Sequence, residues 1–149
     1  MRSGDIEQFI PHRGAMRWVD RMLEWDEHSV TVELIVPLDG PFHESGGVPV
    51  WIGFEYMAQA IAAWAGYCAR NRGEPPRMGF LLGTRRYTAQ TRHFAPGTRL
   101  SVQARCEFDD GQGMGLFACR ILAGEQVLAS ANMSVYQPDD AQAQKLLAS

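Results

Sequence analysis

Hydrophobic positions along the chain follow two different patterns. Between residues 49 and 72 the sequence PVWIGFEYMAQAIAAWAGYCARNR is apolar on nearly every side of a helix. A helix of this kind must be buried, so the pattern predicts a central helix over about residues 49–72. Glycine and proline recur in the loop over 37–49 that precedes it, and Gly73 marks its end.

An alternating pattern typical of strands occupies most of the remaining chain. It begins with HSVTVELIV at 28–36 and returns four times after the helix, over 79–92, 98–108, 114–122 and 126–136. Short turns that contain glycine separate these last stretches, as expected of antiparallel neighbours. One buried helix against such a sheet predicts an α+β fold in which the sheet wraps the helix.

The two ends of the chain carry weaker patterns. Residues 4–10 predict a short helix that Pro11 stops, and residues 138–149 predict a polar tail. Because no linker or repeat divides the chain, we expect a single domain over residues 1–149.

Composition and charge narrow the class of function. The chain has 149 residues, of which 46% are hydrophobic and 21% charged, and its net charge is −3. These values are typical of a globular domain, and the negative charge argues against nucleic acid as a partner. The three cysteines form no CxxC pair or metal-ligand spacing, and polar residues interrupt the longest apolar stretch. We therefore expect a cytoplasmic protein with reduced thiols, without a metal, a cofactor or a membrane span.

Glu55 and Gln59 are the polar positions inside the apolar part of the helix, one turn apart on the same face. A buried carboxylate costs several kcal/mol unless it is paired, hydrogen-bonded or protonated. Two interpretations remain open. Glu55 either lies in a partly buried first turn that favours negative charge, or is a catalytic acid held by Gln59 and tuned by burial. In the second case, backbone N–H groups at the start of the helix suit a developing oxyanion.

Four histidines are candidates for a general base. His43 lies in the loop before the helix, where it is either solvated or forms an acid–base pair with Glu55 at the entrance of the helix. His12 is interpreted as structural, His28 as solvated, and His93 as structural because it has no evident acidic partner.

Several arginines gather near the strand after the helix. Arg85, Arg86 and Arg92 form either a solvated strand face or a shallow basic patch. A basic patch would suit an acidic partner such as a carrier protein that bears phosphopantetheine.

Three segments together resemble one family. The block PHRGAMRWVDRMLEWDE at 11–27 resembles the PHR…VDR block of FabZ-type 3-hydroxyacyl-ACP dehydratases. FEYMAQA at 54–60 is similar to the EAMAQA helix of that family, and FHESGGVPVWIGFE at 42–55 takes the place of its GHFPG…PG…E segment. The resemblance covers nearly the whole chain and implies a hotdog fold, in which a sheet wraps one helix and two subunits pair into a continuous sheet.

The resemblance also implies roles for individual residues. In such dehydratases a loop histidine of one subunit and a helix carboxyl of the other share a site. By motif position His43 would remove the C2 proton of a 3-hydroxyacyl thioester, and Glu55, with Gln59 as its partner, would deliver a proton to the leaving hydroxyl. The Val50–Trp51 amide would hold the thioester carbonyl.

The chain departs from the FabZ pattern around the predicted base. The HFPG motif has become His43-Glu44-Ser45-Gly46, and Glu44 would raise the pKa of His43 if the two are close. The Pro-Gly at the helix entrance has become Pro49-Val50, and a glycine returns at Gly53, as in the FabA branch. W-x-G at 64–66, LG at 82–83 and QP at 137–138 make the chain most similar to the ApeP-like dehydratases of aryl polyene clusters, which work beside a second subunit.

Two classes of function follow from these observations. The first is a hydro-lyase that dehydrates 3-hydroxyacyl thioesters on an acyl carrier protein, in a fatty-acid or aryl polyene pathway. The second is a non-catalytic hotdog subunit that completes an active dehydratase, as a homodimer or heterodimer partner. A hotdog thioesterase is a third reading, since those enzymes also use a carboxylate near the helix start.

Overall fold

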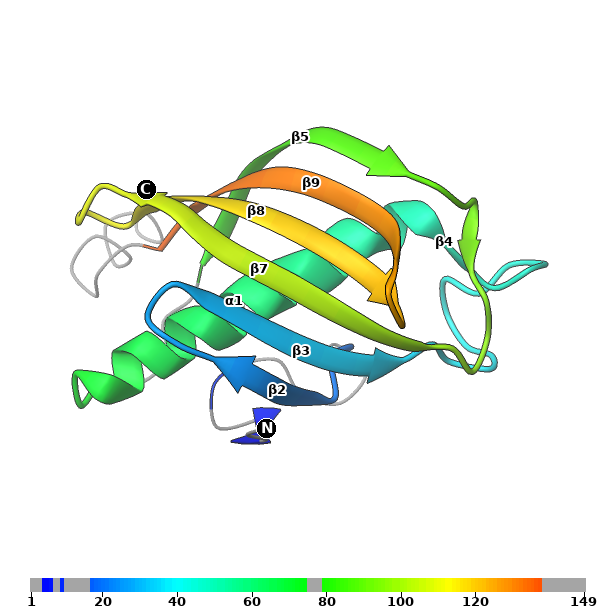
Figure 1. The fold of residues 1–149 in the computed structure, drawn as a ribbon, viewed down its shortest axis with the longest axis horizontal. Helices are drawn as coiled ribbons and strands as arrows, with labels where there is room; N and C mark the ends of the chain where they lie inside the picture. The colour runs from blue at the N-terminus through cyan, green and yellow to red at the C-terminus, as the bar shows by residue number, and fades with distance from the viewer. Residues whose placement is uncertain (1–3, 7–8, 10–16, 75–78, 138–149) are drawn as a thin grey trace.

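The structure is a computed structural model and describes residues 4–6, 9, 17–74 and 79–137 (Figure 1). Its main element is a seven-stranded antiparallel sheet with the strand order β1-β2-β3-β7-β8-β9-β5. In this order the strands are Gly4–Asp5, Arg21–Trp25, Ser29–Ile35, Arg99–Asp109, Met114–Ala123, Gln126–Tyr136 and Phe80–Ala89.

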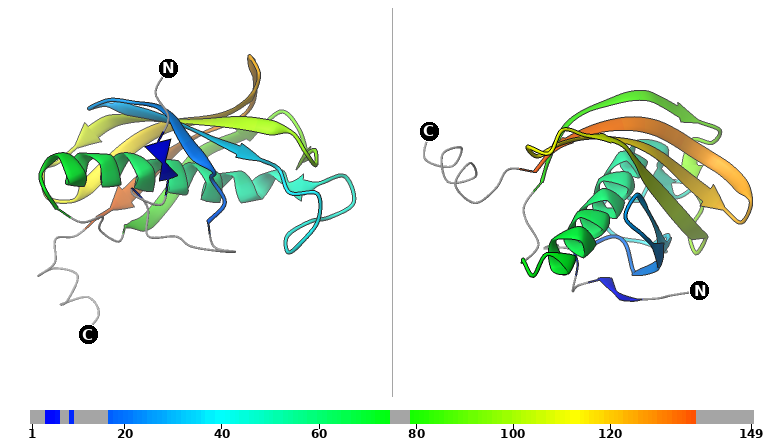
Figure 2. Two further views of the ribbon diagram at one scale, coloured as in Figure 1. Left: turned by 90° about the horizontal axis from the view of Figure 1, so that it is seen from below. Right: turned by 60° about the vertical axis from the view of Figure 1, so that its left-hand side comes forward.

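The helix α1, Gly53–Asn71, lies against the concave face of this sheet, which curls around it (Figures 1 and 2). A 3₁₀ turn, η3 at Val50–Ile52, leads into it. Just before this turn, β4 (Val48–Pro49) pairs with β6 (His93–Phe94) in a separate two-stranded sheet. The loop between β3 and β4 extends beyond the N-terminal end of α1 (Figure 2).

Alternation along the central strands gives the sheet one apolar face. Val102 of β7 pairs with Ile121 of β8, and both side chains are buried in the core beneath the sheet. Their neighbours Gln103 and Arg120 pair on the opposite face, where the amide oxygen of Gln103 accepts a hydrogen bond of 2.7 Å from the guanidinium. This period of two is what places one face of each strand on the helix.

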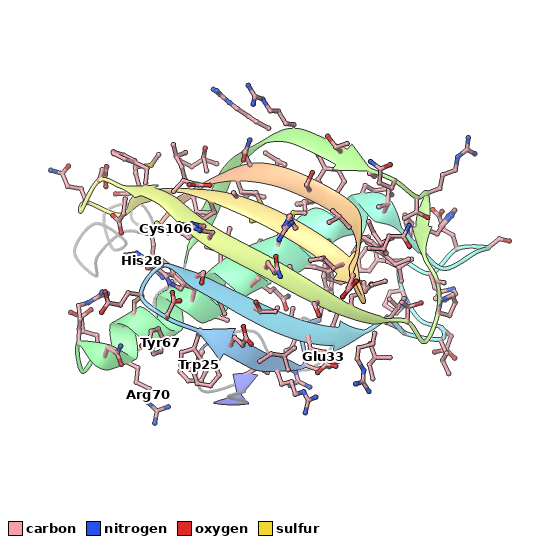
Figure 3. All side chains as sticks on the ribbon, viewed as in Figure 1. Trp25, His28, Glu33, Tyr67, Arg70 and Cys106 are labelled. Atoms are coloured by element: carbon pink, nitrogen blue, oxygen red, sulfur yellow. The ribbon has the colours of Figure 1, made fainter. Side chains whose placement is uncertain are left out.

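Close contact between α1 and the N-terminal part of the chain depends on a glycine. A Cβ atom at Gly66 would lie 2.6 Å from the carbonyl carbon of Phe9, so a larger residue does not fit there. The Phe9 ring packs near Trp25, whose ring in turn lies 6.4 Å from that of Tyr67, and Arg70 lies 5.7 Å from the centre of the Phe9 ring. Figure 3 shows Trp25, Tyr67 and Arg70 together at the C-terminal half of α1.

These observations confirm the predicted α+β hotdog fold, with the sheet wrapped around one long buried helix. The predicted strand at 126–136 has the observed bounds of β9, and α1 ends at Asn71, two residues before Gly73, which has a φ of +74°. The predicted helix at 4–10 is wrong at its start, since Gly4 and Asp5 form the strand β1 on the edge of β2.

Other parts of the sequence prediction change or lie outside the described residues. The strand predicted over 79–92 ends at Ala89, and its last residues lead into β6. Residues 11–16 of the PHR block and the predicted tail over 138–149 lie outside the described part of the chain. Among the described helices, none is long and apolar enough to span a membrane.

Candidate active site

The entrance of α1 is held by hydrogen bonds to the peptide units on either side of Val50. The Val50 N–H donates to the carbonyl of Arg92 at 2.9 Å. The Val50 carbonyl accepts from the Gly53 N–H and from the hydroxyl of Tyr87. Within the described residues the next N–H group, that of Trp51, has no backbone partner, as is usual in the first turn of a helix. The amide predicted to hold a thioester carbonyl therefore has a fixed orientation and an available donor.

Glu55 lies in the first turn of α1, where the helix dipole favours a carboxylate. Its side chain is partly exposed in this single chain, and it has no hydrogen bond or ion pair with a described residue. The position matches the partly buried first turn considered from the sequence. In this position the Glu55 carboxyl can also contact a group from another molecule.

Gln59 lies one turn further along α1, with only 2% of its surface exposed. Its amide oxygen accepts hydrogen bonds from the Trp18 N–H at 2.8 Å and from the Val19 N–H at 3.3 Å. The predicted pairing of Gln59 with Glu55 is not made by a hydrogen bond in this chain. Gln59 instead joins the VDR block to the buried helix, a structural task that its position in the sequence did not reveal.

His43 lies just before a tight turn. Glu44 and Gly47 exchange backbone hydrogen bonds at 2.8 and 3.1 Å, which closes the turn around Ser45 and Gly46. Gly47, with a φ of +125°, packs so close to β6 that a Cβ atom there would lie 3.0 Å from the Phe94 carbonyl carbon. This contact fixes the loop against the small sheet at the helix entrance.

The imidazole of His43 carries the clearest sign of a functional site. Its Nε2 atom is buried and has no hydrogen-bond partner among the described residues. Buried polar atoms are nearly always paired, because an unpaired one loses its hydration without compensation. An unpaired imidazole nitrogen is therefore suited to a substrate atom or to a group from another subunit.

His93 and Glu44 form a side-chain hydrogen bond that sequence reasoning missed. His93 Nε2 and Glu44 Oε2 are 3.1 Å apart, although the residues are 49 positions apart in the chain. The interpretation of His93 as lacking an acidic partner is therefore wrong. This bond to β6 ties the Glu44 side chain, and with it the loop, to the small sheet. The pairing of β4 with β6 brings the two residues together, and the local sequence does not predict this pairing.

The three arginines of the predicted patch are exposed. Arg85 and Arg86 lie in β5, where Arg86 has a φ of +55°, and Arg92 lies in the connection to β6. The backbone of Arg92 contacts the helix entrance through the Val50 N–H. Close to that entrance, Trp51 is 55% exposed.

Within the described residues, no three His, Cys, Asp or Glu side chains are placed to hold a metal ion. Burial raises the pKa of the Cys119 thiol to about 12, and burial also raises the pKa of Cys68 and Cys106. Thiols of this kind are mainly neutral near pH 7 and serve as core residues rather than as nucleophiles.

The antiparallel sheet wrapped around one helix, together with the family comparison, identifies a dehydratase-like hotdog protein. The ApeP-like family, described as ApeP dehydratase, matches residues 4–147 of the sequence. The chain therefore belongs to the ApeP-like dehydratase family, as its motifs predicted.

Solved structures agree with this assignment. A chain in the structure of the dehydratase heterocomplex ApeI:P from Xenorhabdus doucetiae is 28% identical, with a TM-score of 0.89 over 98% of this chain and 99% of that one. Two more distant structures share the fold alone. The uncharacterized protein PH1136 from Pyrococcus horikoshii is 16% identical (TM-score 0.66; 89% of this chain, 93% of that one). A hypothetical thioesterase with coenzyme A from Streptococcus pneumoniae TIGR4 is 12% identical (TM-score 0.61; 79% and 87%). No curated protein sequence matches the chain.

Proposed function

We propose that this chain eliminates water from a 3-hydroxyacyl thioester carried by an acyl carrier protein, at a site shared between two hotdog subunits in the cytoplasm. The observation that carries the proposal is the buried, unpaired Nε2 of His43 in a chain of a dehydratase family. Glu55 supports it, because its carboxyl at the helix start has no partner within the described chain.

The reaction assigns one proton transfer to each residue. His43 Nε2 removes the C2 proton of the thioester, and the resulting negative charge on the thioester oxygen is stabilised by the Trp51 N–H. Glu55, protonated at this stage, gives its proton to the C3 hydroxyl, which leaves as water while the C2–C3 double bond forms. The products are a trans-2-enoyl thioester, a protonated His43 and a deprotonated Glu55. Transfer of one proton between the two groups through solvent restores the starting state.

A second subunit is needed for this arrangement. β5 is the last strand of the sheet order, so one of its edges is unpaired among the described residues, and Leu82 on it is 55% exposed. An unpaired edge with exposed apolar residues suits pairing with another strand. A second hotdog subunit on this edge would bring its own histidine loop toward Glu55, and this loop toward the partner's carboxyl.

The partner is either a second copy or a different subunit. Similarity over 98% of the chain to a member of a dehydratase heterocomplex favours the different subunit. It also keeps the alternative that this chain completes the partner's site without using its own histidine. The exposed Arg85, Arg86 and Arg92 are proposed as the surface that meets the acidic carrier protein.

The test measures formation of the enoyl thioester by its ultraviolet absorbance, with 3-hydroxybutyryl thioester on an acyl carrier protein as substrate. The chain is assayed alone and after co-expression with a second hotdog subunit from the same source. We expect His43→Ala and Glu55→Gln to lower kcat by about 100-fold or more, which is the usual contribution of an acid or base. His28→Ala is the matched control, because His28 is exposed in the β2–β3 turn.

Each alternative predicts a different result. Full activity of the co-expressed complex with His43→Ala would remove the histidine from the mechanism, and loss with Glu55→Gln alone would then indicate the partner role. If the chain is active alone, mixed dimers of His43→Ala and Glu55→Gln distinguish shared from separate sites. A shared site leaves one intact histidine–carboxyl pair in each mixed dimer, whereas separate sites leave none.

A further inference from the structure

Tyr87 is placed differently from the rest of its strand. Residues 81–86 and 88–89 of β5 are exposed, whereas Tyr87 is partly buried and packs against the core. Its hydroxyl donates a hydrogen bond to the Val50 carbonyl at the entrance of α1, 37 residues earlier in the chain. Through this side chain an edge strand of the sheet contacts the 3₁₀ turn η3 that leads into the helix.

A β-bulge turns Tyr87 toward the helix. Arg85 and Thr88, three residues apart in β5, pair with residues that are only two apart in β9. The extra residue is accommodated by Arg86, whose φ of +55° lies in the left-handed region that residues other than glycine seldom adopt. Bulges of this kind re-aim a side chain, and they are frequent next to active sites. Strain is therefore retained in β5 at the point where it directs Tyr87 inward.

At the helix entrance, the absence of a side chain at Gly53 leaves space for the Tyr87 hydroxyl. A Cβ atom at Gly53 would collide with the Tyr87 hydroxyl and would lie 2.9 Å from Ile121 Cδ1. Gly53 has a φ of −56°, so its backbone does not require glycine, and the missing side chain serves space alone. The glycine that the sequence analysis placed before Glu55 is what lets the hydroxyl reach the Val50 carbonyl.

We propose that Tyr87 is a positioning residue that orients and polarises the Val50–Trp51 amide as the donor to the thioester oxygen; the proposal rests on the proposed dehydration. The carbonyl that accepts from Tyr87 and the N–H of Trp51 belong to the same peptide unit. Withdrawal of electron density at the carbonyl oxygen makes the N–H a stronger donor, because linked hydrogen bonds polarise one another. The bond from the Val50 N–H to Arg92 restricts rotation of the same segment from its other side.

The protonation state of Tyr87 suits this task. Burial, with a smaller contribution from Tyr56, raises the pKa of Tyr87 to about 12. The hydroxyl therefore keeps its proton, and remains a hydrogen-bond donor, at neutral and moderately alkaline pH. A tyrosine that ionised near neutrality would lose the proton that it donates to the Val50 carbonyl.

Tyr87→Phe tests the proposal in the same complex and with the same 3-hydroxybutyryl substrate as above. We expect kcat to fall by about tenfold with KM changed by less than about twofold, a smaller loss than removal of a whole oxyanion donor. We also expect the ¹⁵N resonance of the Trp51 amide, assigned with Trp51→Phe, to move upfield. Gly53→Ala is a second variant, since it keeps the tyrosine but displaces its hydroxyl, and it should lower kcat in the same way.

Tyr67→Phe is the matched control, because it removes the same hydroxyl at the other end of α1, beside Trp25 (Figure 3). It should change neither kcat nor the Trp51 resonance. A Tyr87→Phe complex with kcat within about twofold of wild type, while Glu55→Gln is inactive, would overturn the role of Tyr87 and leave the dehydration intact. If the wild-type complex does not dehydrate the substrate, the proposed function is wrong. In that case the Trp51 resonance alone tests the role of Tyr87, and an unchanged resonance in Tyr87→Phe overturns the proposal.

Discussion

Replacing Gln59 with methionine separates the structural task of this residue from the catalytic one that its place in the helix suggested. Methionine has nearly the same length and volume, so the cavity left is small. The change removes the oxygen that accepts from the Trp18 and Val19 N–H groups at 2.8 and 3.3 Å. Each buried N–H left without a partner costs about 1–3 kcal/mol. Because the second bond is long, we expect a total loss of about 3 kcal/mol in the free energy of unfolding.

A loss of this size is easily measured. Domains of this kind unfold with about 5–15 kcal/mol, and a urea m-value near 2 kcal/mol per molar converts about 3 kcal/mol into a midpoint about 1.5 M lower. Gln103→Met is the matched control, since Gln103 bonds to the exposed Arg120 on the outer face of the sheet, and it should change stability by less than about 0.5 kcal/mol. A Gln59→Met protein as stable as the control, with kcat reduced, would show that Gln59 acts on Glu55 and not on the VDR block.

Three further predictions concern the loop, the helix contact and the core. His93→Phe removes the exposed hydrogen bond to the Glu44 carboxylate. Because exposed contacts of this kind contribute about 0–1 kcal/mol, kcat should fall by at most about fivefold, with faster amide exchange in the loop. A loss of about 100-fold would instead make His93 a reacting group. Gly66→Ala should stabilise α1 by about 1 kcal/mol through helix propensity, but it forces a methyl group against the Phe9 carbonyl. Because this overlap costs about 1–3 kcal/mol of folding free energy, Tm should fall. A raised Tm would refute the close contact. Burial raises the pKa of Cys119 from 9.0 to about 12, so the neutral thiol stabilises the fold fully below pH 9 and progressively less as pH rises toward 12. At about pH 9 Cys119 should react with a thiol reagent only as the protein unfolds. Rapid labelling of the native protein would contradict this.

Long, regular segments of the fold were predictable because their patterns repeat. The helix and the strands β3, β7, β8 and β9 each carry several periods of buried positions, and β9 was predicted with its observed bounds. β2 was missed because a bulge between Met22 and Glu24 breaks its alternation. The pairing of β4 with β6 was missed because two residues on each strand are too few to leave a pattern.

The residues of the candidate site also differ in whether a local sequence pattern could predict them. His43 and Glu55 could be proposed from the sequence because they occupy motif positions close to one another. Tyr87 and His93 were not, because their partners lie 37 and 49 residues away and only the folded sheet brings them together. The task of Gln59 was missed for the same reason, since its two donors lie about 40 residues earlier.

The irregular edge of β5 also bears on how the protein behaves at high concentration. A long regular edge strand accepts further strands without limit and invites aggregation. β5 is interrupted twice, between Leu81 and Gly83 and between Arg85 and Thr88, and it carries two adjacent arginines at the second interruption. Only a strand with a matching irregularity can follow it for more than a few residues. The bulge that turns Tyr87 inward therefore also restricts this edge to a fitted partner and protects the chain from open-ended self-assembly.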